Sequence, residues 1–301
     1  MTVHRLIGSP LAAIIFLVTA GTVSAQTQKE LLDELDRTIE EAESYVSAKE
    51  LRIKTIENTL HSRGVSPERQ YRIYGELFDE YQPFNYGKAV ETLDKQMEIA
   101  MLLGDKSKLN DVYLKEAMLN TAAGEFLEAR NDLARVDTTI FTKEQEIAYC
   151  NVQQRFWFDY DENLKGADKS MLRKVAYYRE RLLALADPSS SLSRYVTVRK
   201  YIDEKNFAQA DFINRHSLSR MDPASHDYAN LAYFQARICE SLNRREEMKN
   251  WFIRSAMADI KTATKDNASL FSLADALFKD GDYARAFKYS SFSLEDAIAF
   301  D

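Results

Sequence analysis

Residues that form tight turns are scarce in this sequence. It has only 9 glycines and 5 prolines among 301 residues. Sheet-rich folds need many tight turns, and these two residues supply most of them. Their scarcity argues against an all-β architecture. Hydrophobic residues, in contrast, make up 45% of the chain, and the aromatics comprise 16 tyrosines, 16 phenylalanines and 2 tryptophans. This composition is typical of a helical protein with a substantial core.

Chemically reactive groups are also few. Cys150 and Cys239 are the only cysteines, and both occur in apolar helical patterns, which predicts two buried free thiols. The chain has four histidines and none of the motifs of metalloproteases, serine hydrolases or nucleotide-binding loops. We therefore expect no enzymatic activity and no cofactor or metal site.

Positive charge is not concentrated in any part of the chain. The 40 basic and 47 acidic residues are interleaved and give a net charge of −7. Proteins that bind nucleic acid usually carry a basic patch or stripe. We therefore expect no direct nucleic-acid binding by this chain.

The first 25 residues differ from the rest. Arg5 is their only formally charged side chain, residues 11–18 form an apolar run, and small residues follow at Val23-Ser24-Ala25. A retained N-terminal anchor is the alternative, but the run is shorter than the ~20 residues of a membrane-spanning helix. The sequence thus predicts export to the periplasm, with a signal peptide over residues 1–25 that is cleaved after Ala25.

A long amphipathic helix is predicted next, within residues 26–64. Residues 27–60 contain no glycine or proline, and their apolar residues recur at alternating spacings of four and three, interrupted only by Lys49. That pattern suits a dimerising coiled coil or a helix that caps the next hairpin. We favour the capping helix.

The remaining residues, 65–301, repeat with a period near 40. Short turns are followed by an aromatic residue with an alanine three positions later, as in Phe126 with Ala129. A fixed period of this size, with two helices per unit, predicts an all-α fold. We expect a right-handed α-solenoid of five or six helix pairs, with the 27–60 helix at one end. The residues that open the second helices are Tyr86, Phe126, Phe207, Arg245 and Tyr283.

This pattern resembles the tetratricopeptide repeat (TPR). In that family a small residue lies nine positions before the aromatic. Here Ala117, Ala236 and Ala274 occupy that position, whereas Val198 departs from it. The resemblance implies that the first helices of the pairs line a concave groove that binds a protein or peptide partner.

Most of the mature chain also resembles a Bacteroidetes family of exported TPR proteins that carries only a domain-of-unknown-function label. The stretches ELDRTIEEAESYVSAKELRIKTIENTL and SAMADIKTATKDNASL carry the resemblance. Longer members look like membrane-tethered transcriptional regulators, which implies that this chain is the extracytoplasmic sensing part, tethered to the membrane through sequence downstream. The apolar C-terminal stretch DAIAFD has no polar capping helix, so we expect a truncated repeat array. The alternatives are a stand-alone periplasmic scaffold and a carbohydrate-binding accessory protein, which the many aromatics would suit.

Two stretches imitate ligand sites. Asp159, Asp161 and Asn163 alternate as in a calcium loop, but Leu164 and Ser170 occupy the places of its glycine and glutamate. We interpret this stretch as a polar loop between helices. The aromatic cluster QRFWFDYD could line a cleft, but its helical spacing favours the core, with Trp157 on a different face.

The partner site is predicted on the first helices of two neighbouring units. Placing these units in register aligns Tyr195 with Tyr233 and Arg199 with Arg237. Each tyrosine lies four residues before its arginine, so the two side chains share one helix face. Such a ladder would suit an acidic or C-terminal peptide, because arginine binds a carboxylate through two parallel hydrogen bonds. The alternative is that the tyrosines only pack and the arginines pair with local acids, namely Asp203 and Glu240.

Overall fold

The structure is a computed structural model that describes residues 27–166, 169–265 and 268–300. These residues form fourteen α-helices and one short 3₁₀ helix, Thr138–Ile140, and contain no β-strand. The all-α prediction is therefore confirmed. The predicted signal peptide lies outside the described residues.

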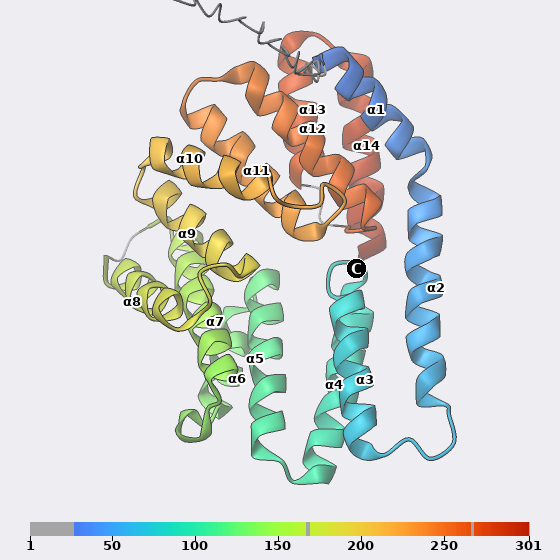
Figure 1. Cartoon of the computed structure of the whole chain (residues 1–301), viewed down its shortest axis with the longest axis vertical. Coiled ribbons are helices and arrows are strands. Elements are labelled where there is room, and N and C mark those ends of the chain that lie inside the picture. Colours follow the sequence, from blue (N-terminus) through green and yellow to red (C-terminus); the bar gives the residue numbers. More distant parts are fainter. Residues whose placement is uncertain (1–26, 167–168, 266–267, 301) are drawn as a thin grey trace, which may run out of the picture.

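Twelve of the helices form six consecutive hairpins (Figure 1). Each hairpin joins two helices by a short turn, so the two run antiparallel. The pairs are α3 (Pro67–Tyr81) with α4 (Tyr86–Leu103), α5 (Lys106–Ala123) with α6 (Phe126–Arg135), α7 (Lys143–Asn163) with α8 (Lys169–Leu185), α9 (Ser191–Asp203) with α10 (Phe207–Leu218), α11 (His226–Ser241) with α12 (Arg245–Lys261), and α13 (Ala268–Asp280) with α14 (Tyr283–Phe300).

The predicted hairpin register is confirmed residue by residue. Each of the five residues expected to open a second helix is the first residue of that helix. In four hairpins the residue two positions before the start of the second helix has a positive φ. These residues are Gly124 (78°), Lys205 (58°), Asn243 (59°) and Gly281 (86°). A left-handed residue at this place ends the first helix and turns the chain back.

The small residues of the pattern lie where neighbouring helices meet. Ala117, Val198, Ala236 and Ala274 are all buried, so the valine serves the same purpose as the alanines. Ala286 lies in the same core cluster as Ala274, as the pattern predicts. The opening aromatics are less uniformly buried than expected, because Tyr283 is 63% exposed, although its ring packs on that of Phe278 in α13, with the ring centres 5.2 Å apart.

The predicted N-terminal helix is divided in two at Glu41, into α1 (Gln28–Glu40) and α2 (Ala42–Leu60). The helix α2 packs on α3, as expected of a capping helix. Its interrupting residue, Lys49, is buried and pairs with Glu80 of α3 at 3.2 Å. Glu80 also accepts two hydrogen bonds from Arg52, at 2.6 and 3.0 Å.

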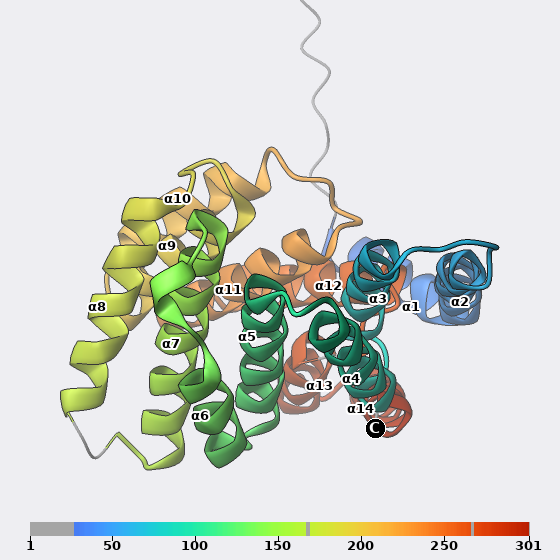
Figure 2. The same ribbon diagram turned by 90° about the horizontal axis from the view of Figure 1, so that it is seen from below.

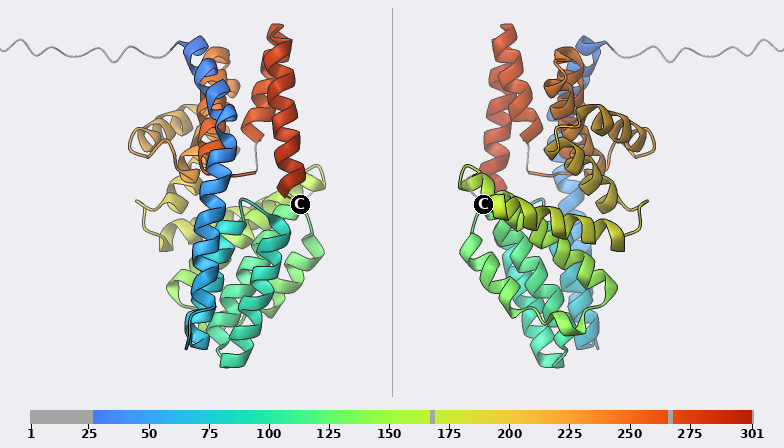
Figure 3. Two further views of the ribbon diagram at one scale, coloured as in Figure 1. Left: turned by 90° about the vertical axis from the view of Figure 1, so that its right-hand side faces the viewer. Right: turned by 90° about the vertical axis from the view of Figure 1, so that its left-hand side faces the viewer.

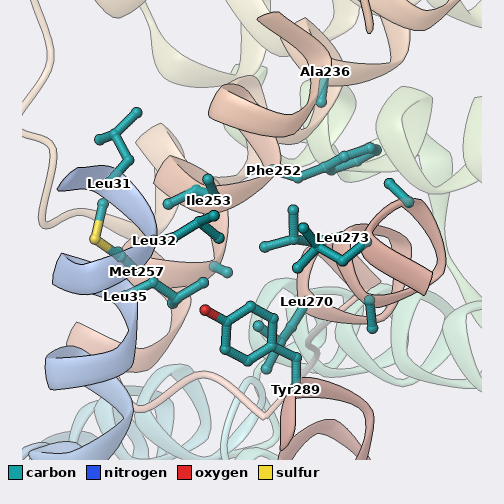
Figure 4. Packing of buried hydrophobic residues seen from close by; sticks show 14 of the residues in the cluster. Leu31, Leu32, Leu35, Ala236, Phe252, Ile253, Met257, Leu270, Leu273 and Tyr289 are labelled. Atoms are coloured by element: carbon teal, nitrogen blue, oxygen red, sulfur yellow. The ribbon is translucent and has the colours of Figure 1, made fainter. Parts of the chain in front are cut away.

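The helix α1 packs against the last repeats instead. Leu31, Leu32 and Leu35 join a core with Phe252 of α12 and Tyr289 of α14 (Figure 4). We expected the 27–60 helix at one end of an open array. That placement is wrong, because α1 and α2 together bridge the first hairpin to the last two.

Other contacts also join the two ends of the array. The backbone N–H of Lys265, after α12, donates to the carbonyl of Pro83, in the turn between α3 and α4, at 2.8 Å. The rings of Tyr86 at the start of α4 and Phe300 at the end of α14 lie 6.2 Å apart. Seen from below, α3 to α8 form an arc, and the last helices return towards α3 and α4 (Figure 2). The described chain is thus a closed turn of helices.

The predicted state of the two cysteines is confirmed. Cys150 and Cys239 are free and buried, and burial raises the pKa of Cys150 to about 11. Among the residues that the structure describes, no helix is both long and apolar enough to cross a membrane.

Candidate functional site

The closed arrangement surrounds a central hollow of about 1060 Å³. Residues of α3, α4, α5, α7, α9, α11, α13 and α14 line it. Helices from both ends of the array therefore contribute to one cavity. The hollow depends on the closure, because Pro83, Tyr86, Lys265 and Phe300 are at once closure contacts and lining residues.

A smaller cavity of about 330 Å³ opens beside the central hollow, and we call it the inner pocket. It lies among α7, α8, α9, α11, α12 and α13. The two cavities adjoin, since they share the lining residues Arg155, Tyr195, His226, Asn230, Thr264 and Ala268.

Arg199 is the best-positioned charged group of the inner pocket. Its guanidinium carbon lies 4.2 Å from the ring centre of Phe158 on α7 and 5.8 Å from that of Phe234 on α11. The Nε of Arg199 donates to Asp203, one turn later on α9, at 3.1 Å. Its two terminal amino groups make no hydrogen bond within the described residues. Arg199 is thus held in place by one edge while its other edge stays available.

A second arginine shares the same carboxylate. Arg179 of α8 is 5% exposed and donates to Asp203 at 2.8 Å and to Gln154 at 3.5 Å. Its Nε is buried and has no hydrogen-bond partner. Two guanidinium groups therefore share one carboxylate, and the acids Asp159, Glu162 and Asp259 also line the pocket.

Tyrosine and phenylalanine side chains form one wall of the inner pocket. The ring centres of Tyr195 and Phe234 lie 4.9 Å apart, and those of Tyr233 and Phe234 lie 6.4 Å apart. Tyr233 also contacts Phe252 in the core, at 5.8 Å. The predicted tyrosines therefore pack on aromatic neighbours and at the same time line the pocket.

The fourth predicted residue lies elsewhere. Arg237 pairs with Glu240 at 2.6 Å, and half of its side chain is exposed. It lines a separate cavity of about 340 Å³ among α11, α12 and α13. Three residues of the predicted ladder, Tyr195, Arg199 and Tyr233, thus line the inner pocket together. The fourth, Arg237, lines the separate cavity.

The floor of the inner pocket is polar. The hydroxyls of Ser255 and Ser269 lie 2.6 Å apart, and Ser255 also donates to the carbonyl of Ala229 at 2.8 Å. Nδ1 of His226 lies 3.3 Å from the hydroxyl of Thr264. These groups could orient a polar ligand.

The aromatic cluster of α7 serves two purposes. Phe156 is buried and packs on Phe126 and Tyr160, as the core interpretation predicts. Phe158 instead lines the inner pocket, which the sequence interpretation missed. Trp157 lies on a third face, where the ammonium of Lys174 sits 3.4 Å from its ring centre.

We expected the calcium-like stretch to be a loop between helices, and that interpretation is wrong. Asp159, Asp161 and Asn163 belong to the last turns of α7, and Asp159 forms an ion pair with Arg155. Within the described residues, no cluster of acidic, histidine or cysteine side chains could hold a metal ion.

Comparison with known families agrees with this architecture. The model of the SusR N-terminal TPR domain matches residues 39–301. The chain belongs to this family. Among curated proteins, no sequence matches it. TPR domains are typically non-catalytic and bind other proteins, and their repeats supply extended concave surfaces for this purpose. The match confirms the TPR resemblance that the aromatic and small-residue pattern indicated.

Proposed function

We propose that this TPR domain binds an acidic or C-terminal peptide segment of a partner protein in the inner pocket. The observation that carries the proposal is the geometry of Arg199. Its guanidinium is held by Phe158, Phe234 and Asp203, and its terminal amino groups make no hydrogen bond within the described residues. A planar guanidinium with two free parallel donors suits a carboxylate.

The aromatic wall supports the same ligand class. Tyr195 and Tyr233 offer flat apolar area with a hydroxyl at the edge, a combination that is common where peptides bind. The adjoining central hollow is large enough to receive residues beyond the one that Arg199 binds. Arg237, in the neighbouring cavity, would contact a longer peptide and contribute less to its affinity.

We further propose that the domain is the sensing part of a membrane-tethered regulator that faces the periplasm. The apolar run and small residues of the first 25 positions support export. The matching family is named for the N-terminal domain of SusR, which supports a role as one module of a larger protein. In such an arrangement, partner binding in the inner pocket would be the signal, and a tether downstream would pass it on.

Peptide binding can be measured directly by fluorescence anisotropy. The probes are labelled peptides that end in one or two acidic residues with a free C-terminal carboxylate, beside the same peptides as C-terminal amides. We expect the free-acid peptides to bind, and Arg199→Ala to weaken their binding at least tenfold. Arg237→Ala should have a smaller effect.

The matched control is Arg130→Ala, which removes an exposed arginine of α6 that lines neither the inner pocket, the cavity beside Arg237 nor the central hollow. It should leave the affinity unchanged. Equal peptide affinity in Arg199→Ala and the unaltered protein would contradict the proposed site. Binding of soluble oligosaccharides in place of any peptide would support the carbohydrate-binding alternative instead.

A further inference from the structure

The last helix, α14, carries an exposed apolar stripe. Tyr283 is 63% exposed, Phe287 75%, Leu294 62% and Ile298 70%. Their spacing of four, seven and four residues places them on one side of the helix. The opposite side, with Ala286, Tyr289 and Asp296, is buried against the rest of the protein. Figure 3 shows α14 at the outer edge of the molecule, with no drawn helix beyond it.

The stripe is symmetric about its own centre, which lies between Ser290 and Ser291. Tyr283 lies as far before this centre as Ile298 lies after it. Phe287 and Leu294 are related in the same way. Two serines therefore occupy the middle, and two large apolar residues lie on each side of it.

A stripe with this symmetry complements a second copy of itself. In a two-fold symmetric interface the same surface is used on both subunits, so it must be self-complementary. Two antiparallel copies of α14, crossing at the serines, would place Tyr283 against Ile298 of the other copy and Phe287 against Leu294. The serines are small enough to let the two helices approach closely at the crossing. We infer that this face of α14 is the interface of a homodimer.

Charge and area are consistent with a second copy as the occupant. Glu295 is exposed and has no ion-pair partner within the described residues. The antiparallel arrangement brings it to the same edge as Lys288 of the other copy, about 3 Å away along the helix axis. Within its own copy Lys288 also pairs with Asp36. The four apolar side chains expose roughly 500 Å² per copy, since a large side chain presents about 150–250 Å² when fully exposed. Two copies would bury about 1,000 Å², at the lower end of specific interfaces, so we expect dimerisation at micromolar concentrations.

Disulfide trapping tests this geometry. In the proposed dimer the two copies of residue 291 lie almost level at the crossing, with their Cα atoms about 6 Å apart, a distance that a disulfide can span. Ser291→Cys should therefore yield a disulfide-linked dimer under mild oxidation. Ala284→Cys is the matched control, because its two copies would be about 20 Å apart along the helix axis. The native thiols do not interfere, since Cys150 and Cys239 are buried.

A charge exchange tests the pairing independently. Phe287→Glu and Leu294→Lys should each weaken dimerisation at least tenfold in sedimentation equilibrium. Neither should change the helix content or the melting of the monomer, because both side chains are exposed. The double variant should dimerise better than either single variant, since each new glutamate would face a lysine of the other copy.

A protein that stays monomeric at high micromolar concentration would overturn the inference. So would equal cross-linking of Ser291→Cys and Ala284→Cys, because it would indicate random collision. This inference does not rest on the proposed peptide site, and its outcome leaves that site open to its own test.

Discussion

The residue that ends the first helix of a hairpin is the clearest case in which one side chain determines local structure. Gly124 and Gly281 adopt left-handed φ angles without cost to a side chain. Lys205 adopts the same conformation in its hairpin, with φ at 58°. A residue with a Cβ atom is strained there by about 1–2 kcal/mol. The strain at Lys205 therefore lowers the stability of the α9–α10 hairpin.

Replacing that lysine should stabilise the protein. We expect Lys205→Gly to raise the free energy of unfolding by about 0.5–1 kcal/mol, because relief of the strain exceeds the entropy that glycine adds to the unfolded chain. Thermal or urea unfolding measures the change. Gly281→Ala is the reciprocal variant and should destabilise the protein. A loss of stability in Lys205→Gly would show that the lysine side chain contributes more than the strain costs.

Glu116 on α5 is a partly buried acid that lines neither cavity. Its Oε2 has no hydrogen-bond partner, and Arg135 of α6 lies 3.6 Å away. Burial, assisted by the neighbouring Asp132, raises the pKa of Glu116 from 4.5 to about 7. Because the folded pKa lies above the unfolded one, the folded state holds this proton longer. The contribution of Glu116 to the free energy of unfolding therefore falls as the pH rises from about 4.5 to 7.

Glu116→Gln should remove this pH dependence. The variant should match the unaltered protein near pH 4 and be more stable by about 1–3 kcal/mol above pH 7, where the unaltered side chain is charged. Urea unfolding across this pH range is the measurement. Destabilisation at pH 8 would mean that the ion pair with Arg135 outweighs the cost of burial.

The sequence predicts local features of this protein better than its cavities. Turn residues and opening aromatics lie within a few positions of each other, so one unit contains the whole signal for a hairpin. Phe158 and Phe234 were missed as pocket residues because a helical aromatic is assigned to the core unless the curvature of the array is known. Arg199 was placed on the concave side by the repeat register alone, whereas its partners come from α7 and α11.

At the scale of the element, the division between α1 and α2 is set by tertiary packing. No glycine or proline marks it in the sequence. Glu41 keeps right-handed helical backbone angles, with φ −90° and ψ −2°, but the two helices go on to different partners. One packs on α12 and the other on α3. The heptad-like pattern predicted the apolar faces but not the break, because the two partners lie far apart in the sequence.

A cluster around Asp36 holds α1 to α14. Asp36 accepts hydrogen bonds from Arg285 at 3.0 Å, from Lys288 at 3.0 Å and from the hydroxyl of Tyr289 at 3.2 Å. Burial opposes ionisation of Asp36, but hydrogen bonds from Lys288 and Arg285 outweigh it and lower its pKa. Its contribution to stability is therefore complete above the ordinary carboxyl pKa of 3.8 and is lost as the pH falls below that value.

Asp36→Asn should loosen α1 more than the remaining chain. The substitution leaves the buried hydroxyl of Tyr289 and two cations with a weaker acceptor, at a cost of about 1–3 kcal/mol. Hydrogen exchange of residues 28–40 should accelerate, with little change in α3 to α8. Asp33→Asn is the control, because Asp33 is half exposed and, among the residues that the structure describes, forms an ion pair with Arg285 alone, at 2.7 Å. Equal exchange rates in the two variants would contradict the anchoring role of Asp36.

At the scale of the whole molecule, closure of the array creates the cavities. The repeat pattern does not predict the contacts that close the array, namely Arg285 with Asp36 and Phe300 with Tyr86. The partners in each contact are more than 200 residues apart in the sequence. An open solenoid of the same hairpins would keep Arg199 and its aromatic neighbours but would lose the central hollow. The proposed binding of a longer peptide therefore depends on contact between the two ends.

Cross-linking of those ends tests the account most directly. The double variant Tyr86→Cys/Phe300→Cys places one thiol at each side of the closure, and the two native cysteines are buried. We expect a short bismaleimide to link residues 86 and 300 within one monomer, as seen by peptide mass spectrometry at submicromolar protein concentration. The single variants should give no such link. Thiols that both react with the reagent but are never joined to each other would show that the ends lie apart, and that the closed arrangement and its central hollow do not exist in solution.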